Sequence, residues 1–462
     1  MITKSEFVRR AEYTPRPAYC RGDNNIHKKI VLNSLIAEKL LALDVLSKPQ
    51  YKAPAKLEDY IQGRREQAMR QSYRYEYGMK RVETSDEELK YSFKIASREY
   101  KLGFITLPDS HYAYATKQFL DDGASFESIY SRIFGTQELE IKKVSWFDDD
   151  DPKIREALYS QSLKKDTVVG PLELSDGKFL IFKVVGWQDN LHLSESAKGT
   201  FWDDVISKVK QRKANLLYNE HVANLMRGKS FLLEEAAFRP LVENLSEQYL
   251  MKESEKGSML NETIWELEKQ HLSPDNSDAG ALHMDQVLFR FDGKDWLIKD
   301  FYDLLSRHPL VFRKKRFEMS EFAEQLKFSI ADLLKDYIVT GEAYKEGFGD
   351  RKETISYGQM WQDQYLSGIY KELFNYSLAD SITQSPNSIY FIEAYMNPII
   401  DSLQVKYSDV ISINFDLYDD IKLTHIDMFV AEENVPYPVV VPPFPQITTD
   451  HVFDYGSKLV LK

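Results

Sequence analysis

The stretch from residue 98 to residue 187 constrains the fold more than any other part of the chain. It begins with the apolar run REYKLGFITL, continues with helical patterns from Ser110 and from Ser125, and then has the strand-like run ELEIKKVSWF and a short helix near residues 154–159. The runs VVGPLEL and GKFLIFKVVGW follow, and the Ser-Asp-Gly between them suits the tight turn of a hairpin. This order of strand, two helices, strand, helix and hairpin predicts a small, four-stranded α+β unit.

Three motifs in this stretch resemble those of parvulin-type peptidyl-prolyl isomerases, the family that includes PpiC, SurA and PrsA. They are FLDDGASFESIYSRI for the family's Gly-x-x-Phe helix pair, KKVSWF for its Trp-Phe strand, and LKKDTVVGPLEL followed by GKFLIFKV for its Pro-containing hairpin. The resemblance covers residues 98–188 and implies a cleft that holds a proline-containing peptide.

The sequence departs from the family at the polar positions beneath the bound proline. Where the resemblance places a His, a Cys or Asp, and a second His, this chain has Phe104, Thr136 and Leu180. Phe179 competes with Leu180 for the last position, and neither is His. Prolyl isomerisation has a barrier of ~20 kcal/mol, and its catalysis needs positioned hydrogen bonds. We therefore expect no catalytic residues here and weak or absent turnover.

An apolar cleft without those polar groups can still bind proline. The residues expected to line it are Phe104, Trp146, Phe147, Ile154 and Leu180, with Thr136 as the polar remnant. Trp146 either lines the cleft or fills the core. No metal ligand motif or cofactor motif accompanies these residues, so we expect neither a metal nor a cofactor.

The flanking regions have a helical period. The pattern ITKSEF, LNSLIAEKLLAL, VETSDEELKYSF resembles the N-terminal chaperone lobe of the SurA and PrsA families, which implies that the parvulin-like unit is an insertion. The fold class expected is α+β multidomain, with helical chaperone lobes, the inserted unit and a C-terminal mixed module. The expected divisions are a lobe at 1–97, the parvulin-like domain at 98–188, a helical return at 189–272, a second helical module at 281–380, and a strand-containing segment with a Pro-rich tail at 381–462.

Two features of the C-terminal half leave alternatives open. Aligning Phe301 with Phe7 also aligns Leu326 with Leu32 and Ile330 with Ile36, so the second module either repeats the first or matches it by chance. The run VPYPVVVPPFP from Val435 excludes a helix and an inner strand. It could lie along a groove of the same molecule, lie along a partner, or be solvated.

Composition excludes several functions. With 60 basic and 72 acidic residues the net charge is −12, which argues against nucleic acid as the main partner. The one cysteine, Cys20, excludes an internal disulfide, and we expect no membrane span because every apolar run is short. No signal peptide is visible after Met1, so the chain is either cytoplasmic or a mature form. The family resemblance implies the periplasm or cell envelope.

The leading hypothesis is a chaperone or foldase-like protein, with a role such as outer membrane protein biogenesis. It would bind unfolded or proline-containing client segments, and its parvulin-like domain would lack isomerase activity. One alternative is an active peptidyl-prolyl cis-trans isomerase. Another is a structural accessory subunit of a cell-envelope complex, which would have a few stoichiometric partners in place of many clients.

Overall fold

The structure is a computed structural model, and it divides the chain into two compact units. The described residues are 1–14, 16–20, 24–48, 57–136, 138–148, 151–160, 163–174, 177–190, 194–259, 282–314, 317–378, 388–423, 440–455 and 460–461. We call residues 75–221 the sheet unit, and residues 1–74 with 222–462 the helical unit. The five-part division expected from the sequence stays a prediction.

The sheet unit contains one four-stranded antiparallel sheet. Its elements are the helix α4 (Asp86–Ala96), β1 (Arg98–Leu107), α5 (Ser110–Asp121), α6 (Phe126–Phe134), β2 (Ile141–Ser145), α7 (Pro152–Tyr159), β3 (Val168–Glu173), β4 (Phe179–Asp189) and most of α8 (Glu195–Met226). The strand order is β2-β1-β4-β3, and every neighbouring pair is antiparallel. The predicted order of strands and helices from residue 98 to residue 187 is therefore confirmed.

Polar caps fix where the short helices of the sheet unit begin. The side chains of Asp109, Ser125 and Asp151 accept hydrogen bonds from backbone N–H groups in the first turns of α5, α6 and α7. These bonds satisfy donors that have no partner within the helix. Helix α6 ends at Gly135, whose φ of 69° lies in the left-handed region that glycine tolerates best. Asp151, the last residue of an acidic run that the sequence predicts to be a solvated turn, is thus a helix cap.

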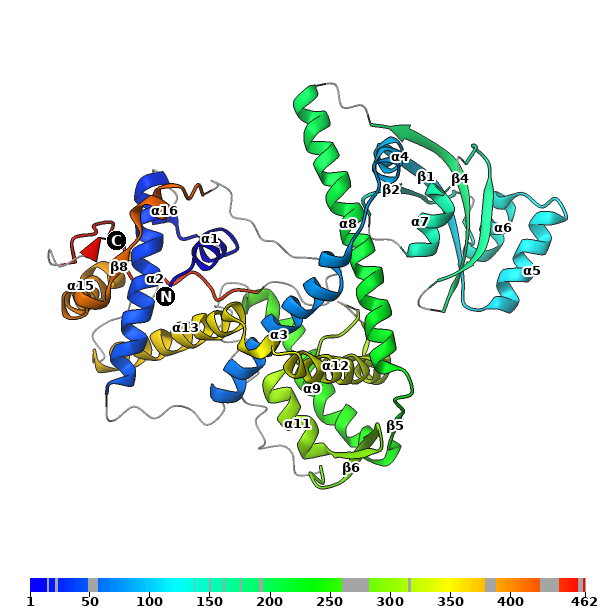
Figure 1. Cartoon of the computed structure of the whole chain (residues 1–462). Coiled ribbons are helices and arrows are strands. Elements are labelled where there is room, and N and C mark those ends of the chain that lie inside the picture. Colours follow the sequence, from blue (N-terminus) through cyan, green and yellow to red (C-terminus); the bar gives the residue numbers. More distant parts are fainter. Residues whose placement is uncertain are drawn as a thin grey trace. The chain divides into compact units, whose positions relative to one another are not determined.

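Helices cover both faces of this sheet. Residues Ile105 and Ile181 point to one face, where they pack against α5 and α6. Residues Leu102 and Phe182 point to the other, where they pack against α4, α7 and α8. Figure 1 shows α5 and α6 on one side of the sheet and α7 on the other. Since strand side chains alternate between faces, the run LGFITL supplies both cores at once.

The helical unit contains most of the remaining elements. They are α1 (Lys4–Glu12), η1 (Ala18–Cys20), α2 (Asn24–Leu46), α3 (Leu57–Tyr77, its last residues in the sheet unit), β5 (Phe231–Leu233), α9 (Glu235–Met259), β6 (Val287–Phe291), β7 (Lys294–Leu297), α11 (Ile298–Arg307), η4 (Met319–Glu321), α12 (Phe322–Lys345), η5 (Phe348–Asp350), α13 (Lys352–Ser377), α14 (Ile389–Phe391), η6 (Ile392–Met396), α15 (Asn397–Lys406), η7 (Ser408–Val410), β8 (Ser412–Ile413), α16 (Phe415–Asp419) and β9 (Val460–Leu461).

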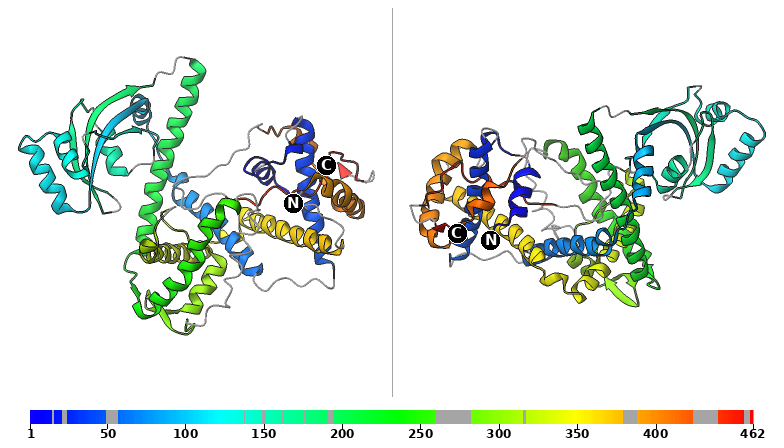
Figure 2. Two further views of the ribbon diagram at one scale, coloured as in Figure 1. Left: turned by 180° about the vertical axis from the view of Figure 1, so that it is seen from behind. Right: turned by 45° about the horizontal axis from the view of Figure 1, so that its top comes forward.

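Two groups of these elements have their own cores. Strands β5, β6 and β7 form a small sheet that packs with α9, α11 and α12. Helices α1, α2, α13 and α15 pack together with residues 440–455, which come from the far end of the chain. Figure 1 and Figure 2 show α2 crossing α13 in this second group. The N-terminal helices thus complete their core with C-terminal residues.

Several local predictions were wrong. The sequence favours Ser5 as the cap of the first short helix, but Thr3 caps α1, because its hydroxyl accepts from the N–H of Glu6 at 3.0 Å. The short strand β5 was missed, since three residues show no period, and it forms because β6 offers an edge. The run DVISINFDLY predicts a strand, and only Ser412–Ile413 of it form one, β8, while helix α16 begins at Phe415 and is capped by Asn414. The strand predicted over residues 421–430 lies mostly outside the described residues.

Other predictions agree with the structure. The run MDQVLFRFDGKDWLIKDFYDLL predicts a hairpin that turns at Asp292-Gly293, and residues 318–346 predict a long amphipathic helix; β6, β7 and α12 lie at these places. Helices α11 and α12 follow one another much as α1 and α2 do, while the repeat itself remains a prediction. Within the described residues, no helix is both long enough and apolar enough to cross a membrane.

Candidate functional site

Phe104 and Leu180 lie on the same face of the sheet unit. Phe104 of β1 pairs with Phe182 of β4, and Thr106 of β1 pairs with Leu180. The rings of Phe104 and Phe182 are 6.3 Å apart. Positions two residues apart along a strand share a face, so Leu180, Phe182 and Phe104 form one continuous apolar surface.

The segment after β2 and helix α7 add the other apolar residues to this surface. Trp146 and Phe147 follow the last residue of β2, and their rings are 5.0 Å apart, edge to face. Ile154 of α7 belongs to the same cluster. Helix α8 contributes Phe201, whose ring lies 5.6 Å from that of Phe147. We call this cluster the apolar face.

The structure brings together five of the six predicted site residues. Trp146, Ile154 and Leu180 are buried in the apolar face, while Phe104 and Phe147 are half-buried at its margin. Thr136 is exposed beyond the end of α6, where its hydroxyl accepts from the N–H of Glu138. Of the two readings of Trp146, the structure has it in the core. Phe104 and Phe147 are therefore the predicted site residues of this cluster that reach the surface.

The Tyr159 hydroxyl beside the apolar face already has hydrogen-bond partners in the protein. The Tyr159 hydroxyl lies 3.0 Å from the carbonyl oxygen of Arg98 and 3.2 Å from that of Val144. The described histidines of this unit lie elsewhere, since His111 is on α5, on the opposite face, and His221 stacks on Tyr77. Lys142 is a group that the sequence analysis missed, and its ammonium lies 5.8 Å from the centre of the Phe104 ring. A cation beside an aromatic ring is one polar feature of this margin.

Solved structures of PrsA are similar to part of this chain. The peptidylprolyl isomerase PrsA of Bacillus anthracis is 16% identical over 42% of this chain and 96% of its own, with a TM-score of 0.22. PrsA of Bacillus cereus is 14% identical over 44% of this chain and 84% of its own, also at 0.22. PrsA of Bacillus subtilis is 16% identical over 43% and 82%, with a TM-score of 0.16. No family model and no curated protein matches the sequence.

A separate pocket of about 290 Å³ lies on the opposite face of the sheet, between α5, α6 and the hairpin. Its main charged group is Lys183, whose ammonium contacts Glu127 at 2.7 Å and Asp166 at 3.0 Å. These hydrogen bonds, first that of Glu127, raise the pKa of Lys183 above its usual value. Because its ammonium is paired with Glu127 and Asp166, Lys183 is better suited to holding the hairpin against α6 than to taking part in a reaction.

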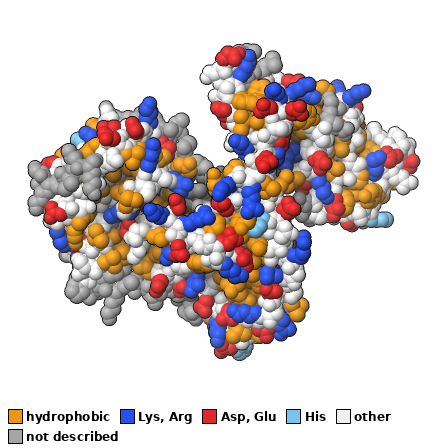
Figure 3. Space-filling model, viewed as in Figure 1, with side chains coloured by type: hydrophobic (Ala, Val, Ile, Leu, Met, Phe, Trp, Pro, Cys, Tyr) orange, Lys and Arg blue, Asp and Glu red, His pale blue; other side chains and the backbone are white. Residues whose placement is uncertain are grey.

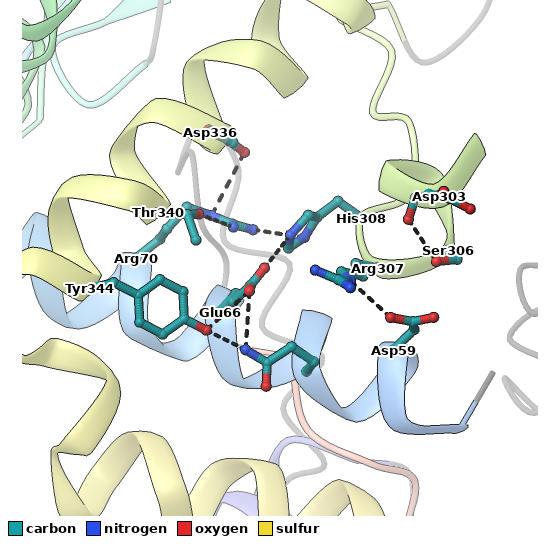
Figure 4. Close-up of polar contacts among 11 residues, drawn as sticks. Asp59, Glu66, Arg70, Asp303, Ser306, Arg307, His308, Asp336, Thr340 and Tyr344 are labelled. Atoms are coloured by element: carbon teal, nitrogen blue, oxygen red, sulfur yellow. Dashed lines mark hydrogen bonds and ion pairs between the residues drawn. The ribbon is translucent and has the colours of Figure 1, made fainter. Parts of the chain in front are cut away.

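The helical unit contains a buried polar network between α3 and α12 (Figure 4). His308 Nε2 lies 2.6 Å from a carboxylate oxygen of Glu66, and its Nδ1 lies 3.4 Å from Arg70. Arg70 also donates to the hydroxyl of Thr340 at 2.9 Å, and the Tyr344 hydroxyl donates to Glu66 at 3.0 Å. Because arginine can only donate, His308 must accept at Nδ1 and carry its proton on Nε2.

The surroundings of this network keep His308 neutral. Burial lowers the pKa of His308 below its usual value, and the positive charge of Arg70 acts in the same direction, against the hydrogen bond to Glu66. Burial would raise the pKa of Glu66, but the hydrogen bond from His308 is the first of several that bring it below its usual value. Glu66 and His308 are both buried, so this network joins helices in the interior of the helical unit.

The described surface shows no single dominant charge. Figure 3 shows basic and acidic side chains interspersed with hydrophobic ones over the visible face of each unit. Among the described residues, no group of three or more His, Cys, Asp or Glu side chains is arranged to hold a metal ion.

Proposed function

We propose that this protein is a chaperone or foldase-like protein whose sheet unit binds unfolded or proline-containing segments at the apolar face. The observation that carries the proposal is the pairing of Phe104 with Phe182 beside Leu180. Phe104 and Leu180 stand where the resemblance places the family's histidines. Packing a client's proline and neighbouring apolar side chains against Phe104 and Phe147 would remove apolar surface from water, which favours binding. Modest affinity then permits release without an energy source.

Isomerase turnover is not part of this proposal. Catalysis needs groups that stabilise the twisted amide more than the planar one. The nearby Tyr159 hydroxyl is bonded to two backbone carbonyls, and the side chains at positions 104 and 180 are apolar. We also propose the cell envelope as its location, as the family resemblance implies.

A matched pair of variants tests the binding face. Phe104→Asp should weaken binding of a labelled alanyl-prolyl peptide at least tenfold, because an aspartate would meet apolar surface. Phe119→Asp, on the exposed side of α5, should leave binding unchanged. Circular dichroism of both variants checks that each is folded. Equal affinity for Phe104→Asp and the unchanged protein would remove the apolar face from the proposal.

The alternatives predict different outcomes. In a protease-coupled assay on the same peptide, the proposal expects the uncatalysed isomerisation rate, whereas an active isomerase would exceed it in proportion to enzyme concentration. In a pull-down, a chaperone retains many unfolded proteins, whereas a structural subunit retains a few partners in fixed ratio.

A further inference from the structure

The C-terminal residues 440–455, which we call the strap, contact the helical unit with a period of three residues. The carbonyl oxygens of Val440, Pro443 and Gln446 accept hydrogen bonds, in that order, from Tyr357 Oη, from Arg10 Nη2 at 2.9 Å and from Lys371 Nζ at 2.8 Å. Each of the three donors is a side chain of α1 or α13. At these three points the acceptors are main-chain oxygens.

The apolar side chains of the strap follow the same period, displaced by one residue. Val441 packs into the core between α2 and α13, and Phe444 and Ile447 pack into the core of α1, α2 and α15. All three are buried. Three residues per turn is the repeat of a polyproline II helix, which leaves its carbonyls available, and this repeat fits residues 440–445. Prolines at 442, 443 and 445 favour that conformation. Residues 446 and 447 form a turn, in which the N–H of Ile447 donates to the carbonyl oxygen of Pro445 at 3.1 Å.

The donors are held in place by the helical unit itself. The guanidinium of Arg10 is fully buried and bonded to both carboxylate oxygens of Glu38, at 2.9 Å and 2.7 Å. Burial lowers the pKa of Lys371 to about 8. Donors positioned in this way bind a peptide without losing much side-chain freedom. We call the surface formed by Arg10, Tyr357, Lys371 and the adjoining apolar core the strap site.

We propose that the strap site is a binding site for extended, proline-containing segments of unfolded polypeptides, with the chain's own strap as its resident occupant. The site fits segments with an apolar side chain at every third position. Hydrogen bonds to the carbonyls of residues 440, 443 and 446 do not depend on side-chain identity, so this part of the site tolerates varied sequences. Further along, the strap is held through its own side chains, since Thr448 and Thr449 bond to Asn397 and Tyr455 bonds to Asn33. This inference rests on the proposed chaperone function for its choice of client, but it concerns a surface in the other unit.

The tethered strap competes with any client for this site. A segment joined to its site by a short linker acts at an effective concentration on the order of millimolar. Clients therefore bind the intact chain weakly and bind it well once the strap is released. The strap is anchored further along by Asn33, whose amide donates to the carbonyls of Asp450 and Val452.

The test uses the full chain with a protease site inserted between residues 430 and 431, outside the described residues. Cleavage leaves the strap in place, so the folded state does not depend on removing it. The probe is a fluorescein-labelled peptide of residues 440–455, followed by anisotropy. We expect it to exchange into the cleaved chain and to bind the intact chain at least about 100-fold more weakly.

Competing peptides separate a tolerant site from a structural element. A peptide that keeps the three prolines together with Thr448, Thr449 and Tyr455, carries leucine at positions 441, 444 and 447 and has serine elsewhere should compete within about tenfold of the strap peptide. A strap peptide with Phe444→Asp and Ile447→Asp should compete at least 100-fold worse. If only the natural strap sequence competes, or if the labelled peptide never exchanges, the strap is a fixed part of the core and the proposal is wrong.

One variant of the site tests the main-chain hydrogen bonds directly. Tyr357→Phe removes the hydroxyl that donates to Val440 and keeps the ring, so it should weaken the strap peptide and the leucine peptide by the same factor, about twofold to tenfold. Tyr337→Phe, an exposed tyrosine of α12, is the control without effect. Unequal losses would refute main-chain recognition. Repeating the assay in Phe104→Asp separates this site from the apolar face, since strap binding should persist there.

Discussion

Replacing Gly63 by alanine should destabilise the helical unit, although alanine is the better helix former. Gly63 lies in α3, and a Cβ at this position would be 1.9 Å from the carbonyl oxygen of Arg307 and 2.7 Å from its carbonyl carbon. Both atoms are backbone, so no side-chain rotation can relieve the overlap. Helix α3 must move away from the end of α11 by more than an ångström, or that turn must deform.

The expected magnitude follows from two opposing contributions. In a helix interior, alanine is favoured over glycine by about 1 kcal/mol. Overpacking costs about 1–3 kcal/mol where neighbours can shift, and more where they cannot. Moving α3 also lengthens the contact between His308 and Glu66, now 2.6 Å. We expect a net loss of about 2 kcal/mol in the free energy of unfolding of this unit.

Gly341→Ala is the matched control. Gly341 lies in α12 of the same unit, and a Cβ there would meet nothing within 4 Å. That variant should gain about 0.5–1 kcal/mol. Urea unfolding followed by hydrogen exchange of the α11 and α12 amides reports on this unit alone. If Gly63→Ala proves as stable as Gly341→Ala, α3 does not pack against Arg307 and the polar network loses its basis.

Two further predictions concern buried charge. The pKa of His308 is lowered in the folded state, so the unfolded chain binds the extra proton and stability should fall as pH drops below the ordinary histidine value of 6.5; the lowered pKa of Glu66 adds a further loss below 4.5. Urea midpoints at pH 7.5 and 5.5 should differ in the unchanged protein and differ less in His308→Gln. Glu38→Ala leaves the guanidinium of Arg10 buried without its carboxylate and should cost about 3–5 kcal/mol, whereas Glu235→Ala, from an exposed pair, should stay within about 0.5 kcal/mol by thermal unfolding.

The sequence predicts elements well where a period or a cap is local. The alternation of LGFITL, the Ser85 and Ser125 caps, and the Asp-Gly turn between β6 and β7 all depend on neighbours within a few positions. Strand β5 depends on β6, which lies more than fifty residues further along the chain, so no local pattern could show it. The candidate site follows the same rule: Phe104 and Leu180 were found through motif spacing, whereas the exposed position of Thr136 depends on how the chain leaves α6.

The polar contacts of the helical unit were beyond the reach of sequence patterns. Arg10 and Glu38 are separated by 28 positions, and Glu66 and His308 by 242. In each helix these residues read as ordinary surface charges, because a charged residue on an amphipathic helix is usually exposed. The burial of these charged residues, and the identity of their partners, become visible only in the folded structure, where the distant segments pack together.

Buried polar partners have a consequence for how the helical unit holds together. Helices held by apolar contacts alone can shift past one another at little cost, since one methyl group can replace another. The charges of Glu66 and Arg10, by contrast, have their hydrogen-bond partners in only one arrangement of the helices. Arg10 links this requirement to the strap, because the same guanidinium bonds to Glu38 and to the carbonyl of Pro443. When a client segment replaces the strap, it must offer a carbonyl at that point or leave Arg10 with one fewer acceptor. In the proposed exchange, the strap site would therefore select for main-chain conformation at position 443 through a charge that the helices already keep in place.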